Sequence, residues 1–554
     1  MTLRPAGTST WTTRGNFQNP NAMKGCSIKI PIPLIVIGLA LFFLQRNYMD
    51  EYPKNIHAWA EQDHYALALG FLNNGFDLFH PETMIYNKQF PDWWKTASDS
   101  TITAVDFPIH EYCAALLMKL FGTTSPWVFR LWTLLWGLIG LLYLYRVAFF
   151  VTHSFSKSLF VSFLALCSPV FIFYSNGFLP SIPALALGII GLWHYILFIG
   201  EGKRRQFHLS IVFLTLAMLI RTTFAIELIA ILCFELLRIY RKESTLVDKL
   251  PAVLLSAAAF IGYYLWNRHL REVYGSIFLS QLVPPEDLQD AKELIVDTYH
   301  QWTFHYFQRS QYIVFALLIA VAVGYAIRNR KLRGETQPSQ TLSLWWLGAI
   351  YTFGCLLFSV AMMQQMPYHD YYLLDTYFLP ILLMVMLTLK TVETRRLWLK
   401  VTFVGVAVIL CSQWFHGAKT MQETRRETED AALLSYVHFK DADLVLDSLN
   451  IPRDAKILCL YGYPQNGPFI QMGRKGYIVM EDDDELLDAA FKWDYDYIVI
   501  ENAQFAKYFD TRREMLSRLK KIGGNNSFAV CTPTNNWIYK ATWQFLYPPK
   551  PKEK

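Results

Sequence analysis

The chain has 554 residues, of which 53% are hydrophobic, 16% aromatic and 17% charged, whereas an average soluble domain is about 25% charged. This composition excludes an ordinary soluble enzyme and a disordered or collagen-like chain, and it predicts a membrane protein. The eight cysteines are scattered without a CxxC or Cys/His spacing, so neither a zinc site nor a disulfide framework is indicated. The formal net charge of +6 reflects orientation in the membrane, and nothing in it favours nucleic-acid binding.

Eleven segments are apolar over lengths near the about 17–25 residues that cross a bilayer. They are residues 30–46, 127–150, 158–176, 181–200, 206–220, 222–240, 250–267, 310–327, 342–363, 371–390 and 398–415. The first is followed by no small-residue cleavage site, so we expect it to be retained as an anchor. The fifth is marginal in length.

Lysine and arginine gather in alternate connections, for example residues 203–205 and 238–249, which are therefore expected in the cytoplasm. The other short connections contain Arg221 as their only cation. This alternation requires residues 110–121 to form an interfacial helix instead of a span. It places residues 1–29 in the cytoplasm as an N-terminal tail. Two long loops, residues 47–126 and 268–309, and the C-terminus then lie outside the plasma membrane.

Charged residues become frequent after residue 415. The runs KILCLY (456–461) and YDYIVI (495–500) predict buried strands. Helical periodicity occurs in residues 427–449, 484–491 and 503–519. The fold class predicted is a polytopic α-helical membrane protein of about eleven spans (residues 30–415), followed by a small extracytoplasmic α/β domain (residues 416–554). No glycine-rich phosphate loop occurs at its strand-to-helix turns.

The first outer loop contains WAEQDHYALALGFLNNGFDLFHPE, residues 59–82. It predicts a helix to about Leu72, a turn, and then His80-Pro81. Glu61, Asp63 and His64 stand at the start of this helix. Acids in a first turn commonly act as helix caps. The alternative is a partly desolvated carboxylate that accepts the proton of a sugar or alcohol hydroxyl as a general base.

The end of the same loop carries Asp106 before the interfacial helix and His110 and Glu111 at its start. An acid near a proline is also a common turn device. Ionisable groups nevertheless accumulate at one membrane surface, which favours a polar binding site. The expected substrate-binding residues of this loop are His64, His80, Asp106, His110 and Glu111.

A second polar group, QQMPYHDYY (364–372), stands at the outer end of the ninth and tenth segments. An aromatic interface belt accounts for Tyr371 and Tyr372 but not for His369 and Asp370, so we expect all four to bind a polar headgroup. Arginine can hold a lipid phosphate, and Arg130 and Arg221 lie at outer ends of segments. Either arginine can equally snorkel to the interface or pair with a buried acid such as Glu227.

In this order and placement, the motifs resemble the membrane-embedded C-type glycosyltransferases, a superfamily that includes protein O-mannosyltransferases and lipid A aminoarabinose transferases. The resemblance covers residues 30–415. Besides the acid that opens the first-loop helix, the similar stretches are Gly75-Phe76-Asp77 before His80-Pro81, DFPIHEYCAALLMKLFG (106–122), Ser168-Pro169 with Tyr174-Ser175 and Pro180, and HDYYLL (369–374).

The resemblance implies transfer of a sugar from a polyprenyl-phosphate donor to a hydroxyl acceptor, which is a lipid, a glycan or a protein, at the outer membrane surface. It also implies a first-loop acid as catalytic base. The spacing of the mannosyltransferase Asp-Glu pair leads to Glu61, whereas a shorter bacterial spacing leads to Asp63. We prefer Asp63 because aspartate is the usual residue. No adjacent Asp-Glu pair occurs at this helix, and Ser181 stands where an aspartate often follows the proline.

The expected reaction is a single displacement with inversion, in which Arg130 or Arg221 holds the departing phosphate. No cofactor is required for such a leaving group, although a divalent ion stays an open alternative. A carrier or flippase of lipid-linked sugars is the alternative function, and a membrane scaffold with an outer interaction domain is a third.

Overall fold

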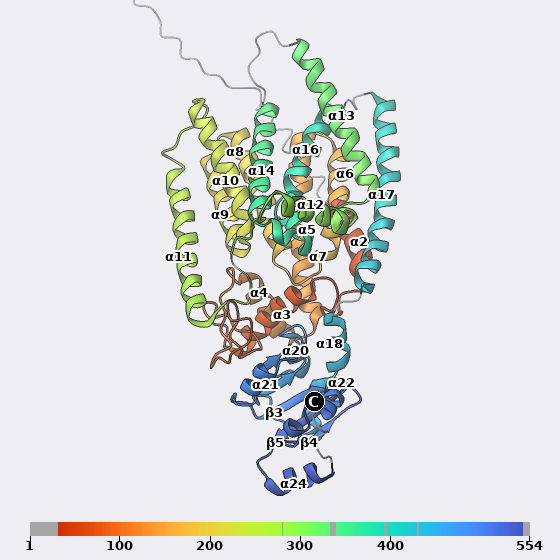
Figure 1. Cartoon of the computed structure of the whole chain (residues 1–554). Helices are drawn as coiled ribbons and strands as arrows, with labels where there is room; N and C mark the ends of the chain where they lie inside the picture. The colour runs from red at the N-terminus through yellow and green to blue at the C-terminus, as the bar shows by residue number, and fades with distance from the viewer. Residues whose placement is uncertain (1–30, 280, 333–339, 393–395, 429–430, 547–554) are drawn as a thin grey trace, which may run out of the picture.

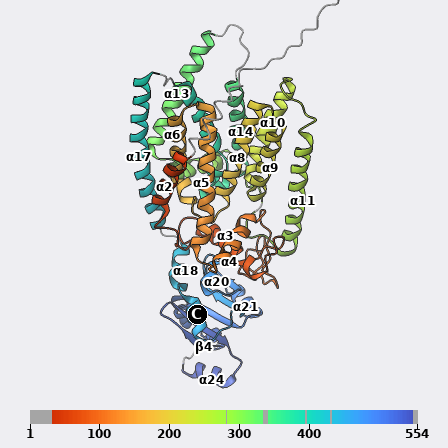
Figure 2. The ribbon, with the colours of Figure 1, turned by 180° about the vertical axis from the view of Figure 1, so that it is seen from behind.

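The computed structural model describes residues 31–279, 281–332, 340–392, 396–428 and 431–546. A bundle of helices forms one end of the molecule and a small domain with a sheet forms the other (Figure 1). The first outer loop lies between these two parts in both views (Figures 1 and 2).

Each of the eleven apolar segments contains a helix. The helices are α2 (Pro31–Gln45), α5 (Pro126–Thr152), α6 (Phe155–Leu166) with α7 (Pro169–Tyr174), α8 (Ser181–Glu201), α9 (Arg204–Ile220), α10 (Ala225–Tyr240), α11 (Leu250–Tyr274), α13 (Arg309–Leu332), α14 (Gln340–Ala361), α16 (Phe378–Thr391) and α17 (Leu397–Glu427). Within the described ranges, α5, α8, α11, α13, α14 and α17 are long and apolar enough to cross a membrane. An integral membrane protein is thereby supported, while the number of eleven spans and their orientation stay predictions.

The third segment is broken between α6 and α7 at Ser168-Pro169. Proline has no N–H and its ring clashes with the preceding turn, so a helix cannot continue through it without disruption. At this break, the hydroxyl of Ser168 donates a hydrogen bond to the carbonyl of Tyr306 at 2.7 Å. After α7, residues 175–180 form the turn that leads into α8 at the outer end of the bundle.

Both helices predicted in the first outer loop are confirmed as α3 (Ala58–Asn73) and α4 (Ile109–Phe121). The interpretation of the acids of α3 as solvated caps is wrong. The N-cap residue of α3 is His57, whose side chain caps no backbone N–H, and both Glu61 and Asp63 are buried. Helix α4 buries one side and exposes Leu116, Leu120 and Phe121, as expected for a helix at a membrane interface.

The second outer loop contains a helix that the sequence pattern did not predict, α12 (Leu288–Tyr306). Its indole of Trp302 donates to the carbonyl of Pro367, 2.7 Å away in the short helix η2 (Met363–Tyr368). This contact joins the second outer loop to the polar stretch that follows α14.

The C-terminal domain has a five-stranded sheet in the order β2-β1-β3-β5-β4. Strands β1 (Ile457–Leu460), β2 (Gly476–Val479) and β3 (Tyr497–Glu501) are parallel, and β4 (Leu519–Gly524) and β5 (Phe528–Pro533) add antiparallel pairs. The strands predicted at residues 456–461 and 495–500 are confirmed. The accompanying helices are α18 (Ala431–Phe439), α19 (Ala442–Ser448), α20 (Gly467–Met472), α21 (Asp484–Ala490), α22 (Asn502–Thr511), α23 (Arg513–Leu516) and α24 (Trp537–Leu546).

Three helix boundaries differ from the sequence-based expectation. The helix expected over residues 503–519 is divided into α22 and α23. The helix expected over residues 427–449 is divided into α18 and α19. Helix α17 continues twelve residues beyond Phe415, so the expected domain boundary at residue 416 falls inside it. The last helix of the bundle therefore carries Arg425 and Arg426 toward the C-terminal domain.

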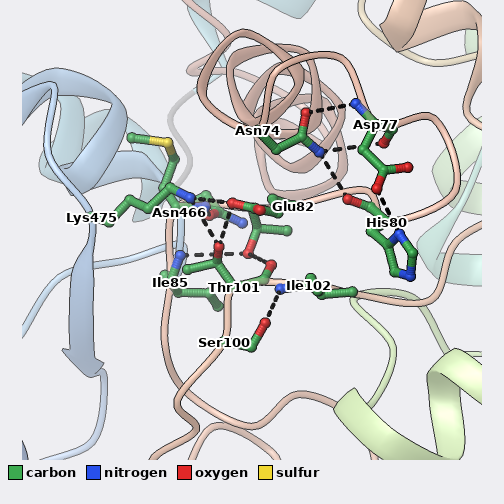
Figure 3. A network of polar contacts seen from close by, with 12 residues as sticks. Asn74, Asp77, His80, Glu82, Ile85, Ser100, Thr101, Ile102, Asn466 and Lys475 are labelled. Carbon is green, nitrogen blue, oxygen red and sulfur yellow. Dashed lines mark hydrogen bonds and ion pairs between the residues drawn. The ribbon is translucent and has the colours of Figure 1, made fainter.

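The first outer loop is paired with the edge of the C-terminal sheet. The N–H of Gly476 in β2 donates to the carbonyl of Met84 at 3.1 Å, and the N–H of Tyr86 donates to the carbonyl of Gly476 at 2.8 Å. The side chain of Asn87 bonds both backbone groups of Ile478. Lys475 reaches Glu82 and Thr101 beside this junction (Figure 3). Backbone pairing of this kind holds the domain against the loop.

Gly70 provides a test of how closely α3 packs on this loop. A Cβ at Gly70 would lie 2.0 Å from the carbonyl oxygen of Glu82, whereas a Cβ at Gly262 in α11 would meet nothing within 4 Å. We expect Gly70→Ala to destabilise the protein by about 1–3 kcal/mol through overpacking, and Gly262→Ala to leave it unchanged or slightly more stable. Thermal unfolding in detergent measures both; equal midpoints would contradict the packing described.

Candidate active site

Asp63 faces the C-terminal domain. Its two carboxylate oxygens each accept a hydrogen bond from Nε2 of Gln465 at 2.9 Å, and Oδ1 accepts one from Nδ2 of Asn466 at 2.8 Å. Burial raises the pKa of Asp63 well above its usual value, and the two amides oppose this shift. Asn466 also accepts from the N–H of Met84. Asp63 therefore joins α3 to the loop before α20.

Glu61 faces the bundle. A Cβ at Gly177 would lie 2.5 Å from its Oε1, so the carboxylate packs directly on the turn between α7 and α8. Burial raises the pKa of Glu61, while the nearby cations Arg130 and Arg426 and a backbone hydrogen bond from Phe178 lower it. This partly desolvated carboxylate, kept near two cations, has the environment of a general base.

A small cavity of about 20 Å³ lies one turn along α3 from Glu61. It brings together four of the predicted site residues, which are His64, Asp106, Glu111 and Arg221. Nδ1 of His64 lies 2.6 Å from Oε1 of Glu111. Although burial acts to raise it, the hydrogen bond and charge of His64 lower the pKa of Glu111. The pair therefore favours an ionised carboxylate at the cavity wall.

Arg221 lines the same cavity as His64 and Glu111. Its Nε donates to Oδ2 of Asp375 at 2.8 Å, and its guanidinium lies over the ring of Tyr371 at 5.1 Å. Asp106 accepts from the hydroxyl of Thr222 at 2.8 Å and is close enough to Arg221 for the guanidinium to lower its pKa, although burial raises it. The buried acid that pairs with Arg221 is thus Asp375 and not Glu227.

Asp370 is the centre of a second, fully buried network. It accepts from Nη2 of Arg425 at 2.6 Å and from the hydroxyl of Tyr174 at 2.7 Å. Nε2 of His57 lies 3.0 Å from the same carboxylate. Burial opposes ionisation, but Arg425 and His57 hold the pKa of Asp370 far below its usual value. Asp370 therefore acts as a fixed anion that ties together α17, α7 and the start of α3.

Part of the Arg130 guanidinium is hydrogen-bonded to backbone carbonyls. Its Nε donates to the carbonyl of Glu51 at 2.9 Å and its Nη1 to the carbonyl of Asn176 at 2.6 Å. The neighbouring Arg426 donates to the side chains of Glu51 and Asn176, each at 2.9 Å. These contacts place two cations beside Glu61.

Two predicted site histidines lie near this centre, His110 buried and His369 half-buried. Burial lowers the pKa of His110 to about 4, and burial, together with the neighbouring His57 and Arg221, lowers the pKa of His369 to about 3. Both rings are therefore neutral at physiological pH. His369 stacks on Tyr371 with ring centroids 5.2 Å apart.

His80 lies apart from these groups. On an exposed turn, its Nδ1 is 2.7 Å from Oδ2 of Asp77. The side chain of Asn74 donates to the carbonyl of His80 and accepts from the N–H of Asp77 (Figure 3). Tyr372 faces a different space, an apolar cavity of about 310 Å³ lined also by Tyr306, Thr376 and Tyr377 and by residues of α12.

Sequence reasoning missed five residues of the site: Glu51, His57, Asp375, Arg425 and Arg426. Asp375 had a usable signal, because an acid inside an apolar segment is a functional candidate by default. Arg425 and Arg426 had a weaker one, since two adjacent arginines follow the last segment. In the described ranges, no three His, Cys, Asp or Glu side chains form a group able to hold a metal ion.

Comparison with known proteins shows a shared fold. Residues 106–271, which include Glu111, Arg130 and Arg221, match the family described as dolichyl-phosphate-mannose-protein mannosyltransferase. ArnT from Cupriavidus metallidurans, solved with bound undecaprenyl phosphate, superposes with a TM-score of 0.54 at 10% identity over 93% of this chain and 99% of that chain. The fold is that of the membrane C-type glycosyltransferases.

A second solved structure agrees. The arabinofuranosyltransferase AftD from Mycobacteria gives a TM-score of 0.50 at 13% identity, over 92% of this chain and 40% of the AftD chain. This chain thus spans less than half of AftD. No curated protein matches the sequence significantly. The resemblance predicted from the motifs is confirmed, and at these identities the two solved structures establish the fold alone.

The Arg425–Asp370 pair gives a stability prediction. Both side chains are fully buried, so Arg425→Ala removes the main cation from a buried anion and should cost about 3–5 kcal/mol. Lys419→Ala on the same helix is the control, because Lys419 pairs with Glu423 at 3.9 Å on the surface and should cost less than about 1 kcal/mol. Thermal unfolding in detergent distinguishes the two, and similar losses would count against a buried network.

Proposed function

We propose that this protein is a glycosyltransferase that moves a sugar from a polyprenyl-phosphate donor to a hydroxyl acceptor at the outer face of the membrane. The observation that carries the proposal is the position of Glu61. This buried carboxylate lies one helical turn from a cavity that joins His64, Asp106, Glu111 and Arg221. The fold shared with ArnT, which was solved with undecaprenyl phosphate, supports this choice of donor.

Glu61 is the base in this proposal, in place of the initially preferred Asp63. Asp63 has both oxygens occupied by amides of the C-terminal domain, and a base needs an oxygen within reach of the substrate hydroxyl. Asp63 then acts as a positioning residue that fixes α3. Glu61 also stands at the position given by the mannosyltransferase spacing.

The reaction is a single displacement. The acceptor oxygen gives its proton to Glu61 and forms a bond to the anomeric carbon, while the bond from that carbon to the phosphate oxygen breaks. The electron pair leaves with the polyprenyl phosphate, and the configuration at the anomeric carbon is inverted. Arg221 stabilises the developing phosphate charge from the cavity wall, and Arg130 adds positive potential near Glu61.

The donor's tail has a candidate place beside this site. The apolar cavity of about 310 Å³ is lined by Leu294, Ile295 and Leu373, with hydroxyls of Tyr372 and Thr376. Tyr372 adjoins Tyr371, over which Arg221 lies. An isoprenoid chain in this cavity would leave its phosphate on the side of Arg221. This placement agrees with the proposed role of Arg221 in holding the phosphate.

A flippase of lipid-linked sugars is the competing function. Ionisable groups of transporters commonly gather near the bilayer midplane, whereas helices α3 and α4, which carry Glu61 and Glu111, lie at the end of the bundle that meets the C-terminal domain (Figure 1). Proteoliposomes supplied with labelled polyprenyl-phosphate sugars separate the two. Movement of labelled lipid without a glycosidic product would refute the transferase.

Glu61→Gln tests the base. It keeps the size of the side chain but cannot accept the proton, so we expect transfer to fall by at least about 100-fold with donor binding retained. Because burial raises the pKa of Glu61, wild-type activity should decline as the pH falls through a value above that of ordinary glutamate. Mass spectrometry of products and a pH profile measure these effects. If Asp63→Asn abolishes transfer while Glu61→Gln does not, Asp63 is the base.

Gly177→Ala tests the position of Glu61 without changing its charge. The added Cβ would lie 2.5 Å from Oε1 and must displace the carboxylate, so we expect kcat to fall by roughly 10–100-fold, as small displacements of catalytic groups do. The control is Gly137→Ala in α5, whose Cβ would make an ordinary contact at 3.5 Å. It should retain wild-type kcat. Unchanged kcat in Gly177→Ala would mean that Glu61 does not need this position.

A further inference from the structure

A cavity of about 1010 Å³ opens in the bundle far from the proposed active site. Helices α5 and α16 end at it, and α6 and α17 begin at it. These ends lie opposite the C-terminal domain in both views, where α6 and α17 run side by side (Figures 1 and 2). None of the site residues described above lines it.

The lining is divided along the bundle axis. Polar side chains occupy the helix ends, with three lysines, Lys157, Lys390 and Lys400, and with His153, Ser154 and Ser156. One to three turns deeper, the wall consists of Phe160, Phe163, Val404, Val408 and Cys411. From Lys400 to Cys411 the helix rises about 16 Å. This is a cationic rim above an apolar trough of acyl-chain length.

The rim carries only positive charge among the described lining residues, since no Asp or Glu contributes to it. Lys157 is buried and donates to the carbonyl of Val392 at 2.6 Å, which fixes its ammonium group between α6 and the end of α16. Lys390 and Lys400 are exposed. A cationic group at a membrane boundary attracts an anionic headgroup.

We propose that this cavity binds one acidic phospholipid, with the phosphate at Lys157, Lys390 and Lys400 and an acyl chain along Phe163, Val404 and Val408. The site is separate from the glycosyl transfer site and does not depend on the proposed function. A zwitterionic phospholipid fits the trough equally well but gains less from the rim, because its headgroup carries no net charge.

The chain's own N-terminal segment is the competing occupant, since Val36 of α2 also lines the cavity. Residues 1–30 contain four cations, Arg4, Arg14, Lys24 and Lys29, and no acid. Like charges repel at short range, so three lysines at the rim disfavour this segment and favour an anionic ligand.

Native mass spectrometry of the full-length, delipidated protein tests the site. We expect phosphatidylglycerol to bind one molecule more tightly than phosphatidylcholine with the same acyl chains. The double variant Lys390→Glu/Lys400→Glu should weaken phosphatidylglycerol binding by at least about tenfold, because two attractive charges become repulsive. Arg205→Glu/Arg241→Glu, with the same charge change at exposed positions outside the cavity, should bind as the wild type does.

A second variant tests the trough without altering charge. Val404→Trp fills the apolar wall and should weaken phosphatidylglycerol binding, while the circular dichroism and melting temperature report whether the variant is folded. Equal binding of the two lipids, or wild-type binding by the lysine double variant, would overturn the proposal. Displacement of phosphatidylglycerol by equimolar undecaprenyl phosphate would also overturn it, because the site would then belong to the donor lipid. The experiment measures lipid binding only, so its result does not depend on whether the protein is a transferase.

Discussion

The burial of the acidic residues of one helix, α3, imposes most of the polar arrangement where the bundle meets the C-terminal domain. Helix α3 lies between the bundle, α4 and the C-terminal domain, so Glu61, Asp63 and His64 are buried away from bulk water. A buried carboxylate is costly unless it is paired or hydrogen-bonded. Asp63 is hydrogen-bonded to two amides, and Glu111 is paired with His64. Glu61 accepts from a backbone N–H and lies near two cations. The helix thus fixes three different elements around it.

The same requirement explains why the arginines of the site are already engaged. Arg425 is held by Asp370, Arg426 by Glu51 and Arg221 by Asp375. Pairs of this kind contribute little net stability, because desolvation offsets their attraction, but they fix the direction of each guanidinium. A preorganised cation needs no rearrangement when charge develops on a phosphate. The arrangement therefore suits catalysis better than it suits stability.

The C-terminal domain contributes to the candidate site by holding the first outer loop and helix α3 in place. Its edge strand β2 pairs with residues of the first outer loop, and its Gln465 and Asn466 hold Asp63. A change in the docking of this domain would move α3, and Glu61 with it. The opposite end of the bundle has a different character, with lysines above an apolar trough. The proposed glycosyl transfer and the proposed phospholipid binding thus concern opposite ends of the bundle.

The sequence by itself determined the apolar segments, helices α3 and α4, and strands β1 and β3, because hydrophobic periodicity reports which side of an element is buried. It also determined which loop carries the acids. Tertiary structure alone gave Glu61 and Asp63 their different surroundings. Residues two apart on a helix point about 200° away from each other, so one faces the bundle and the other faces the C-terminal domain. Periodicity cannot say which partner covers which side. Tertiary structure also brought Arg425 to Asp370, 55 residues away in the chain, because a contact between distant helices leaves no local pattern.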